Sequence, residues 1–230
     1  MNVALITGGS GGFGRALAAA LVGEGWRAVV DGRDAAALHA AAAEIGSGAV
    51  PVAGDVTDPA HREALVEHVR RLGRLDLLVN NASTLGASPL PRLADLHLET
   101  FRRVLEVNVV APLALTQLVL PLLEESGGAV LDLTSDASVE AYETWGGYGS
   151  SKAALDQLSA VFAEEHPAIR VWAFDPGDMR TRMHQDAFPG EDVSDRPEPE
   201  TVVPAVLRLL RERPPSGRVR ASDLLEGVVR

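Results

Sequence analysis

The chain has no cysteine, few aromatic residues and a single lysine among its 21 basic residues. Without cysteine, disulfides, thiolate catalysis and cysteine-type zinc sites are excluded. A formal net charge of −11 argues against a protein that binds nucleic acid through its phosphates. No uninterrupted apolar run approaches the roughly 20 residues that span a bilayer, and residues 1–6 lack the positive flank of a signal peptide. We therefore expect a cytoplasmic protein with no membrane or nucleic-acid partner.

Histidine is the other common zinc ligand, and the six histidines are scattered along the chain. No pair of them has the spacing of metal ligands together with an evident third ligand. We therefore expect no metal site. The histidines are His39, His61, His68, His97, His166 and His184.

Short apolar runs alternate along the chain with longer segments of helical period. Strands separated by helices indicate parallel βαβ units, and strands that are apolar throughout indicate a sheet covered on both faces. We therefore predict one α/β domain over residues 1–230, built as a three-layer, doubly wound parallel sheet. The predicted strands are 2–7, 28–30, 49–53, 75–79, 129–133, 171–174 and 217–221, and the predicted helices are 13–23, 34–45, 59–71, 99–124, 147–165 and 202–211.

A polar stretch at 181–200, with three prolines and a run of acids, interrupts this alternation. In a doubly wound sheet, an insertion near the carboxyl ends of the strands is well placed to close over a substrate. We expect the segment 178–200 to be either such a substrate-binding lid or a solvated surface loop.

A glycine-rich turn at residues 7–14 (TGGSGGFG) joins the first predicted strand to the first helix. Glycines there allow a tight turn and close approach of a pyrophosphate, and the helix N-terminus offers free N–H groups. The turn therefore predicts dinucleotide binding, whereas the lack of a following Gly-Lys-Ser/Thr argues against a nucleoside triphosphate site. Two spacings fit, GxGxxG from Gly9 and TGxxxGxG from Thr7, and the local sequence does not choose between them.

The end of the second predicted strand bears on the form of the dinucleotide. An acid there hydrogen-bonds the ribose 2′-hydroxyl of NAD, whereas an arginine pairs with the 2′-phosphate of NADP. The chain has both, Asp31 and Arg33, on either side of Gly32. The pattern alone favours NADP, with NAD as the alternative.

Tyr148 and Lys152 lie four residues apart in a segment of helical period, so they share one face of the predicted helix. A tyrosine with an unperturbed pKa of about 10 is a poor acid–base catalyst near neutral pH. An adjacent ammonium favours the phenolate and lowers that pKa. Such pairs also occur on solvated surfaces, but Lys152 is the only lysine of the chain. We interpret the pair as a candidate catalytic site.

These features occur with others in the order and spacing of one enzyme family. The chain resembles the short-chain dehydrogenase/reductase family over nearly its whole length. The resemblance selects the TGxxxGxG reading of the turn and implies a Rossmann-like fold in its compact, single-domain form. The matching positions are Thr7, Gly8, Gly12, Gly14, Asp55, Val56, Asn80, Asn81, Ala82, Asn108, Ser135, Tyr148, Lys152, Pro176, Gly177 and Thr181.

The resemblance implies hydride transfer between a nicotinamide cofactor and a small carbonyl or alcohol substrate. Tyr148 would give a proton to the developing alkoxide, or take one in oxidation, and Lys152 would bind the nicotinamide ribose and lower the tyrosine pKa. Ser135 would hydrogen-bond the substrate oxygen, and Asn108 would support a proton relay through water and the lysine. The residues expected to bind the cofactor are Gly8, Ser10, Gly12, Phe13, Gly14, Arg33, Asp55, Val56, Asn81, Ala82, Tyr148, Lys152, Pro176, Gly177 and Thr181.

By the same resemblance, Gly32 falls where NAD-preferring members carry an acid, and Arg33 falls where NADP-preferring members are often basic. We therefore expect NADP(H), with NAD(H) as the less favoured cofactor, and we expect Asp31 to be structural or to face solvent. The chain departs from the family pattern at Ser83, which replaces a glycine. It departs again at Gly11, where many NADP-preferring members are basic, so Arg33 would bind the phosphate largely alone.

Residues beside these segments are candidates for the substrate pocket. Asp136 either binds a cationic or hydrogen-bond-donating substrate or is a polar turn residue, and we favour the second. Trp145 and Met179 either line the pocket or belong to the core. The candidates within the segment 178–200 are Asp178, Met183, His184 and Phe188.

Two other functions are weighed against the enzyme. A catalytically silent NADP(H)-sensing or scaffold protein could share the fold. We would expect such a protein to have lost some of the catalytic residues, and here all four are present. An epimerase or dehydratase is disfavoured because the extended members with those activities usually have longer chains and another glycine spacing. Relatives commonly pair through the helices at 99–124 and 147–165, so we expect a homodimer or homotetramer.

Overall fold

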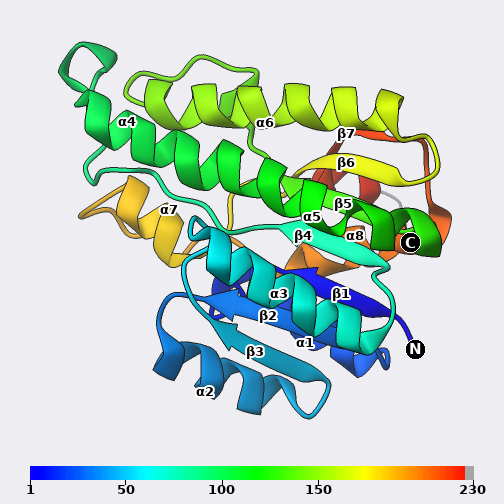
Figure 1. Cartoon of the computed structure of the whole chain (residues 1–230). Helices are drawn as coiled ribbons and strands as arrows, with labels where there is room; N and C mark the ends of the chain where they lie inside the picture. Colours follow the sequence, from blue (N-terminus) through cyan, green and yellow to red (C-terminus); the bar gives the residue numbers. More distant parts are fainter. Residues whose placement is uncertain (226–230) are drawn as a thin grey trace.

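The computed structural model describes residues 1–225, so the last five residues of the predicted domain lie outside the described part of the chain. Seven parallel strands form one sheet in the order β3-β2-β1-β4-β5-β6-β7 (Figure 1). The predicted doubly wound, single-domain α/β fold is confirmed. The strands are β1 (Val3–Ile6), β2 (Arg27–Gly32), β3 (Ala49–Ala53), β4 (Leu77–Asn80), β5 (Ala129–Leu133), β6 (Arg170–Asp175) and β7 (Gly217–Arg220).

Helices cover both faces of the sheet. One face carries Ile6, Val30 and Phe174, which pack with α1 and α8. The other carries Leu5 and Val29, which pack with α3 and α5, and Figure 1 shows these two helices in front of the strands. Successive side chains of a strand point to opposite faces, so a strand buried on both faces is mostly apolar. The α-helices are α1 (Gly12–Gly23), α2 (Ala35–Ile45), α3 (Pro59–Leu72), α4 (Leu98–Leu105), α5 (Ala111–Ser126), α6 (Gly146–Glu165), α7 (Arg182–Ala187), α8 (Val203–Glu212) and α9 (Ala221–Leu225).

Local sequence sets several helix ends. Asp34 caps α2 by accepting a hydrogen bond from the backbone nitrogen of Ala37 at 3.0 Å. Asp58 caps α3 in the same way, and Pro59 occupies its first position. Gly73 ends α3 in a left-handed conformation. These are the residue types that helix ends favour, which is why the predicted boundaries at 34–45 and 59–71 agree closely with the structure.

The predicted helix at 99–124 is one continuous helix, Leu98–Ser126, but it is not α-helical throughout. A π-helical turn, η2 (Glu106–Val110), separates α4 from α5. Such turns arise when one extra residue enters the helix, and they often occur at functional sites. The turn contains Asn108, and the apolar periodicity did not predict it.

By length and composition this continuous helix could cross a membrane, with a mean hydropathy of 1.6 over 18 residues. Charged and polar residues interrupt its apolar sequence, so no uninterrupted apolar run marks it. Its side chains Leu115, Val119 and Leu123 are fully buried and pack with the sheet. This packing explains the apolar composition, and we interpret the segment as a core helix.

The segment 178–200 is more ordered than the expected loop. It contains α7, which Thr181 caps by accepting a hydrogen bond from the backbone nitrogen of His184 at 3.2 Å. A turn of 3-10 helix, η4 (Pro199–Thr201), begins at its end. Figure 1 shows α7 at the edge of the sheet where β2 and β3 end. The action of this segment as a lid stays a prediction.

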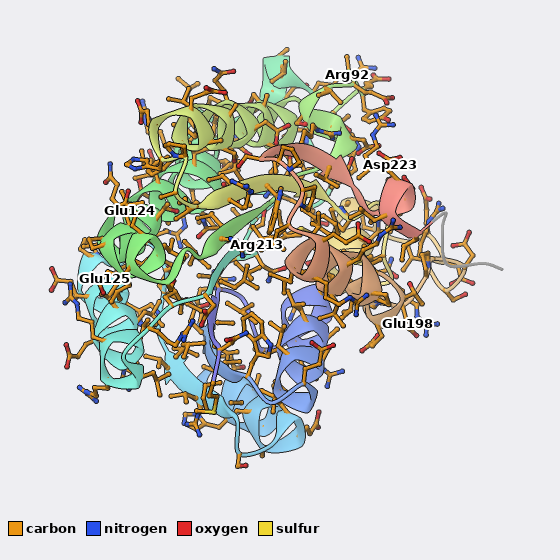
Figure 2. All side chains as sticks on the ribbon, turned by 90° about the vertical axis from the view of Figure 1, so that its right-hand side faces the viewer. Arg92, Glu124, Glu125, Glu198, Arg213 and Asp223 are labelled. Carbon is orange, nitrogen blue, oxygen red and sulfur yellow. The ribbon has the colours of Figure 1, made fainter. Side chains whose placement is uncertain are left out.

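The two edges of the sheet carry different groups. Figure 2 looks onto the edge where the strands begin, and the labelled Glu124 and Glu125 lie at the rim of that view. Arg213 joins the segments at this edge by donating to the carbonyl oxygens of Gly127 and Gly128. The glycine-rich turn follows β1 at the opposite edge. Ligands of doubly wound sheets bind at that edge, outside the carboxyl ends of the strands.

Candidate active site

Glycine is required at defined positions of the turn between β1 and α1. Gly8 and Gly12 have φ values of +70° and +52°, which side-chain-bearing residues rarely adopt. A Cβ at Gly14 would lie 2.5 Å from the carbonyl oxygen of Gly8, whereas a Cβ at Gly11 would meet nothing within 4 Å. The geometry therefore favours the TGxxxGxG reading, in which Gly11 is not one of the required glycines.

The end of β4 holds this turn in place. The hydroxyl of Thr7 accepts hydrogen bonds from the backbone nitrogens of Asn81 and Ala82 at 3.0 and 2.9 Å. The Asn81 side chain donates to the carbonyl oxygens of Thr7 and Gly8 at 2.7 and 3.2 Å. We conclude that the amide of Asn81 shapes the turn, although Asn81 and Ala82 also line the adjacent cleft.

Asp31 is buried beneath the turn. One carboxylate oxygen accepts a hydrogen bond from the backbone nitrogen of Gly8 at 2.6 Å, and the other lies 3.2 Å from Nε2 of His61. The expectation of a structural role is confirmed, and the alternative that Asp31 faces solvent is wrong. With this acid engaged, Arg33 is the exposed charged residue at the end of β2 that faces the cleft.

The larger of two adjoining cavities, about 380 Å³ in volume, begins at the glycine-rich turn. Gly14 does not line it, because this residue serves the close packing of the turn. Phe13 is mostly buried, and its ring stacks on Phe174 at 6.1 Å. The predicted cofactor residues that line this cavity are Gly8, Ser10, Gly12, Phe13, Arg33, Asp55, Val56, Asn81, Ala82 and Thr181.

Two further guanidiniums, those of Arg103 and Arg182, lie in the wall of this cavity, and the sequence did not predict either. Arg103 of α4 donates to Asp55 at 2.7 Å and to the hydroxyl of Thr57 at 2.8 Å. Partial burial opposes ionisation of Asp55, but hydrogen bonds from Thr57 and Arg103 outweigh it and lower its pKa to about 2. Arg33, in contrast, forms no ion pair with any residue that the structure describes.

The smaller cavity, about 130 Å³, joins the larger one, because Asn81, Ser83, Met179, Thr181 and Met183 line both. The two form one continuous cleft along the carboxyl edge of the sheet. The structure thus brings the glycine-rich turn and the candidate catalytic residues together, although they are far apart in sequence. The predicted residues in the smaller cavity include Ser135, Tyr148, Lys152, Pro176 and Gly177.

Tyr148 and Lys152 occupy the first turns of α6, and both are buried. The Lys152 Nζ donates to the carbonyl oxygen of Leu133 at 2.7 Å and lies 5.5 Å from the centre of the Tyr148 ring. Burial lowers the pKa of Lys152 to about 8, although the charges of Asp132 and Asp156 oppose this shift.

The pKa of Tyr148 is raised above its ordinary value, which differs from our expectation. Burial is the main cause, because it disfavours the phenolate. A hydrogen bond with Ser83 lowers the pKa in part, while the charges of Asp175 and Asp136 raise it further. The side chain of Tyr148 is therefore a neutral phenol, which can donate a proton.

Asn108 lines neither cavity, and its side chain is fully buried. Its amide oxygen accepts hydrogen bonds from the Ser83 hydroxyl at 3.1 Å and the Thr84 nitrogen at 2.9 Å. Its amide nitrogen donates to the Thr84 carbonyl at 2.9 Å and to the Ser151 hydroxyl at 3.0 Å. Asn108 thus joins the loop after β4 to α6. The family departure at Ser83 adds a hydroxyl to this network.

Sequence reasoning also missed Arg218 of β7. Its guanidinium donates to the carbonyl oxygen of Ser135 at 3.0 Å and to Asp175 at 2.9 Å. Asp175 in turn accepts a hydrogen bond from the Gly177 nitrogen at 3.1 Å. Arg218 therefore fixes the segments that carry Ser135 and Gly177. A lone arginine in a short last strand carries no sequence signal of this role.

Aromatic side chains join α7 to the start of α6. Trp145 contacts the Tyr148 ring edge-on at 5.7 Å and lies 5.8 Å from the Phe188 ring, measured between ring centres. His184 lies 5.0 Å from Phe188. Of the proposed pocket residues, Phe188 supports the wall without lining it. Those that line the smaller cavity are Asp136, Trp145, Asp178, Met179, Met183 and His184.

Two of these placements bear on alternatives left open by the sequence. Asp136 belongs to the cavity wall and is not merely a turn residue. Met179 lines both cavities and also packs against the core. Within residues 1–225, no three histidine, aspartate or glutamate side chains gather as a metal site.

Comparisons with known proteins agree with this arrangement. A family model described as short chain dehydrogenase matches residues 2–192. Serine 3-dehydrogenase of Rhizobium radiobacter is 37% identical over 183 residues, which cover 78% of this chain and 72% of the relative.

Two solved structures share the fold and were determined with nicotinamide cofactors. The alcohol dehydrogenase of the archaeon Thermococcus sibiricus, complexed with 5-hydroxy-NADP, has a TM-score of 0.85 at 28% identity, covering 96% of this chain and 95% of that one. The 3-ketoacyl-(acyl-carrier-protein) reductase of Brucella melitensis, complexed with NADH, has a TM-score of 0.86 at 27% identity, covering 95% and 96%. The chain belongs to the short-chain dehydrogenase/reductase family, whose members are oxidoreductases that use nicotinamide cofactors.

Proposed function

We propose that the protein is an NADP(H)-dependent oxidoreductase that transfers a hydride between the nicotinamide and a carbonyl or alcohol, with Tyr148 as general acid and base. The observation that carries this proposal is the continuous cleft, which joins the glycine-rich turn to the buried Tyr148 and Lys152. A bound nicotinamide supplies or accepts the hydride; the protein positions the partners and moves the proton.

The residues of the larger cavity fit a dinucleotide. Gly8 and Gly12 give the turn its left-handed backbone, and α1 begins at Gly12, so its first N–H groups are available to phosphates. Asp55 is ionised and fixed by Arg103, so it would accept hydrogen bonds at the adenosine end. The free guanidinium of Arg33 would pair with a 2′-phosphate, since an arginine fork matches phosphate geometry.

Arg33→Ala should therefore weaken NADPH binding by about 10- to 100-fold and change NADH binding by less than about twofold. The measurement is the dissociation constant of each cofactor, followed by cofactor fluorescence. The matched variant is Gly11→Arg, because this position has an extended backbone and open space around its Cβ. We expect Gly11→Arg to strengthen NADPH binding and to leave NADH binding unchanged. Equal losses for both cofactors in Arg33→Ala would contradict the assignment.

In carbonyl reduction, Tyr148 would donate its phenolic proton as the alkoxide develops. Its raised pKa keeps the proton on the phenol until the substrate oxygen becomes basic. Ser135 would donate a second hydrogen bond to the same oxygen. The ammonium of Lys152, near the Tyr148 ring, would stabilise the phenolate that remains and bind the nicotinamide ribose. Asn108 would fix the position of the loop that carries Ser83 relative to α6, and so act as a positioning residue for Tyr148.

The proposed function is tested by offering the protein NADPH with ketones, aldehydes, quinones and pterins. Consumption of NADPH is followed by the absorbance of the reduced cofactor. A carbonyl reductase should turn over at least one class. A protein that binds NADPH but reduces nothing across the panel would support the sensor or scaffold alternative. The intact tyrosine, lysine and serine in one cleft favour the enzyme.

We also propose that two or four copies associate through α5 and α6. Leu118 of α5 is 37% exposed and Val161 of α6 is 41% exposed, so both helices present apolar side chains to solvent. Light scattering should give a mass of two or four chains, and a monomer would contradict this proposal. A cytoplasmic location stays a prediction from the sequence.

A further inference from the structure

We propose that Asp136 makes the substrate cavity selective for charge, so that the substrate carries an ammonium or similar cationic group on the carbon next to the reacting carbon and no carboxylate there. This inference rests on the proposed function, because it names the substrate class of the same site. Among residues 1–225, three carboxylates line the smaller cavity, those of Asp136, Asp175 and Asp178.

Two of these three carboxylates have cationic partners. Asp175 accepts a hydrogen bond from Arg218 at 2.9 Å. Asp178 lies 3.7 Å from His184 and 3.8 Å from Arg196. Each of these two carboxylates therefore has an arginine guanidinium beside it.

Asp136 has no cationic partner within 4 Å among the residues that the structure describes. Its carboxylate accepts hydrogen bonds only from neutral groups, the Ser135 hydroxyl at 2.9 Å, the Ala137 nitrogen at 2.8 Å and the Tyr142 hydroxyl at 3.0 Å. The Tyr142 hydroxyl also lies 2.9 Å from Glu140. A hydroxyl has one proton, so it cannot satisfy both carboxylates at once. The net charge at this wall of the cavity is negative.

The cavity offers little to bind an anion. Its basic lining residues, among those described, are Lys152 and His184. The Lys152 ammonium is buried and donates to the Leu133 carbonyl, and His184 faces Asp178. A substrate carboxylate would meet Asp136 without a free cation to balance it.

A second polar group in the wall of the same cavity has no protein partner among the described residues. Thr134, which is 3% exposed, lines the cavity, and its hydroxyl has no hydrogen-bond partner among the described residues. Buried hydroxyls are normally paired, so an unpaired one at a cavity wall is suited to a polar ligand.

The position of Asp136 defines where the cationic group lies. The Ser135 hydroxyl donates to the Asp136 carboxylate at 2.9 Å, and it would turn its single proton from Asp136 to the reacting oxygen when substrate binds. Asp136 is therefore at most two hydrogen-bond lengths, about 6 Å, from the reacting oxygen. That distance suits a group on the adjacent carbon.

Three secondary alcohols that share the skeleton CH3–CH(OH)–CH2– test the inference: 1-amino-2-propanol, 1,2-propanediol and 3-hydroxybutyrate. Their last groups are an ammonium, a hydroxyl and a carboxylate. Binding to the full-length protein with NADP+ is followed by tryptophan fluorescence, because Trp145 lines the cavity. We expect the amine to bind about tenfold more tightly than the carboxylate, with the diol between them. In Asp136→Asn the three affinities should fall within about twofold of one another.

Asp136→Asn keeps an oxygen that accepts the Ser135 and Ala137 hydrogen bonds, so it removes the charge with little change of shape. The matched control is Glu63→Gln, an exposed residue of α3 that does not line the cavity, and it should keep the order of affinities. Equal affinities in the wild type, or no binding of the amine, would overturn the inference. An unchanged order in Asp136→Asn would overturn the role of Asp136. Turnover is measured separately. If the three compounds bind in the expected order but no alcohol is oxidised and no carbonyl is reduced, the result would contradict the proposed function and leave this inference standing.

Discussion

Tyr148→Phe is expected to lower kcat/KM for carbonyl reduction by about 10³-fold and to change the dissociation constant of NADPH by less than about twofold. Phenylalanine keeps the ring and its packing against Trp145, but it removes the hydroxyl that we propose gives its proton to the alkoxide. The hydroxyl is buried at the cleft, so solvent is poorly placed to replace it. The measurements are initial rates of NADPH consumption and a cofactor titration.

The chain offers a matched control for this variant. Tyr142 is the only other tyrosine, and it is 44% exposed outside the cavity lining. Tyr142→Phe removes the same hydroxyl, and we expect a loss of less than about tenfold. Comparable losses in the two variants would show that the hydroxyl of Tyr148 has no special role. A large loss of NADPH binding in Tyr148→Phe would instead mean that its hydroxyl acts mainly in the cofactor binding that we also expect of Tyr148.

Lys152→Met is expected to lower kcat/KM by about 10²-fold or more and, at the same time, to make the fold more stable. The variant loses the cation beside the Tyr148 ring, but it also removes a charged group from a buried position. A pKa lowered from 10.5 to about 8 corresponds to about 3 kcal/mol of unfavourable burial. Loss of the hydrogen bond to Leu133 offsets about 1 kcal/mol of this gain. The net expectation is a rise of about 2 kcal/mol in the free energy of unfolding.

The pH dependence of stability tests the cause of this difference. Below pH 8 the lysine is protonated in both the folded and the unfolded chain, so the wild type carries the full cost of burying the charge. Between about pH 8 and 10.5 only the unfolded chain stays protonated, so the stability of the wild type should rise relative to Lys152→Met. Denaturant unfolding of both proteins across this range measures the change. A difference that does not vary with pH would contradict burial of the charge as the cause.

Much of the fold could be predicted from local patterns. β1 is apolar at every position, and β5 at every position except Asp132, because both faces of the sheet are covered, and this pattern is visible in the sequence. The capping residues Asp34 and Asp58 mark helix starts through contacts within three residues of themselves. The π-helical turn around Asn108 could not be predicted, because its apolar spacing is compatible with an unbroken α-helix.

The candidate site was likewise predictable only in part. Tyr148 and Lys152 share a helix face, so their neighbourhood follows from their spacing. The direction of the Tyr148 pKa shift does not follow from this spacing. It depends on burial by segments distant in sequence, and burial exceeds the effect expected from the lysine. Arg103 with Asp55, and Arg218 with Ser135, are also pairs that only chain folding brings together.

By itself, the sequence determined the α/β class, the glycine-rich turn and the pairing of Tyr148 with Lys152, because each depends on periodicity or on neighbours a few residues apart. Only the tertiary structure decided that Asp31 lies buried beneath the turn, leaving Arg33 free at the cleft. It alone showed that Asp136, among the carboxylates of the smaller cavity, has no cationic partner within the described residues. Burial and charge balance are sums over groups that distant parts of the chain contribute, so they are settled when the chain packs.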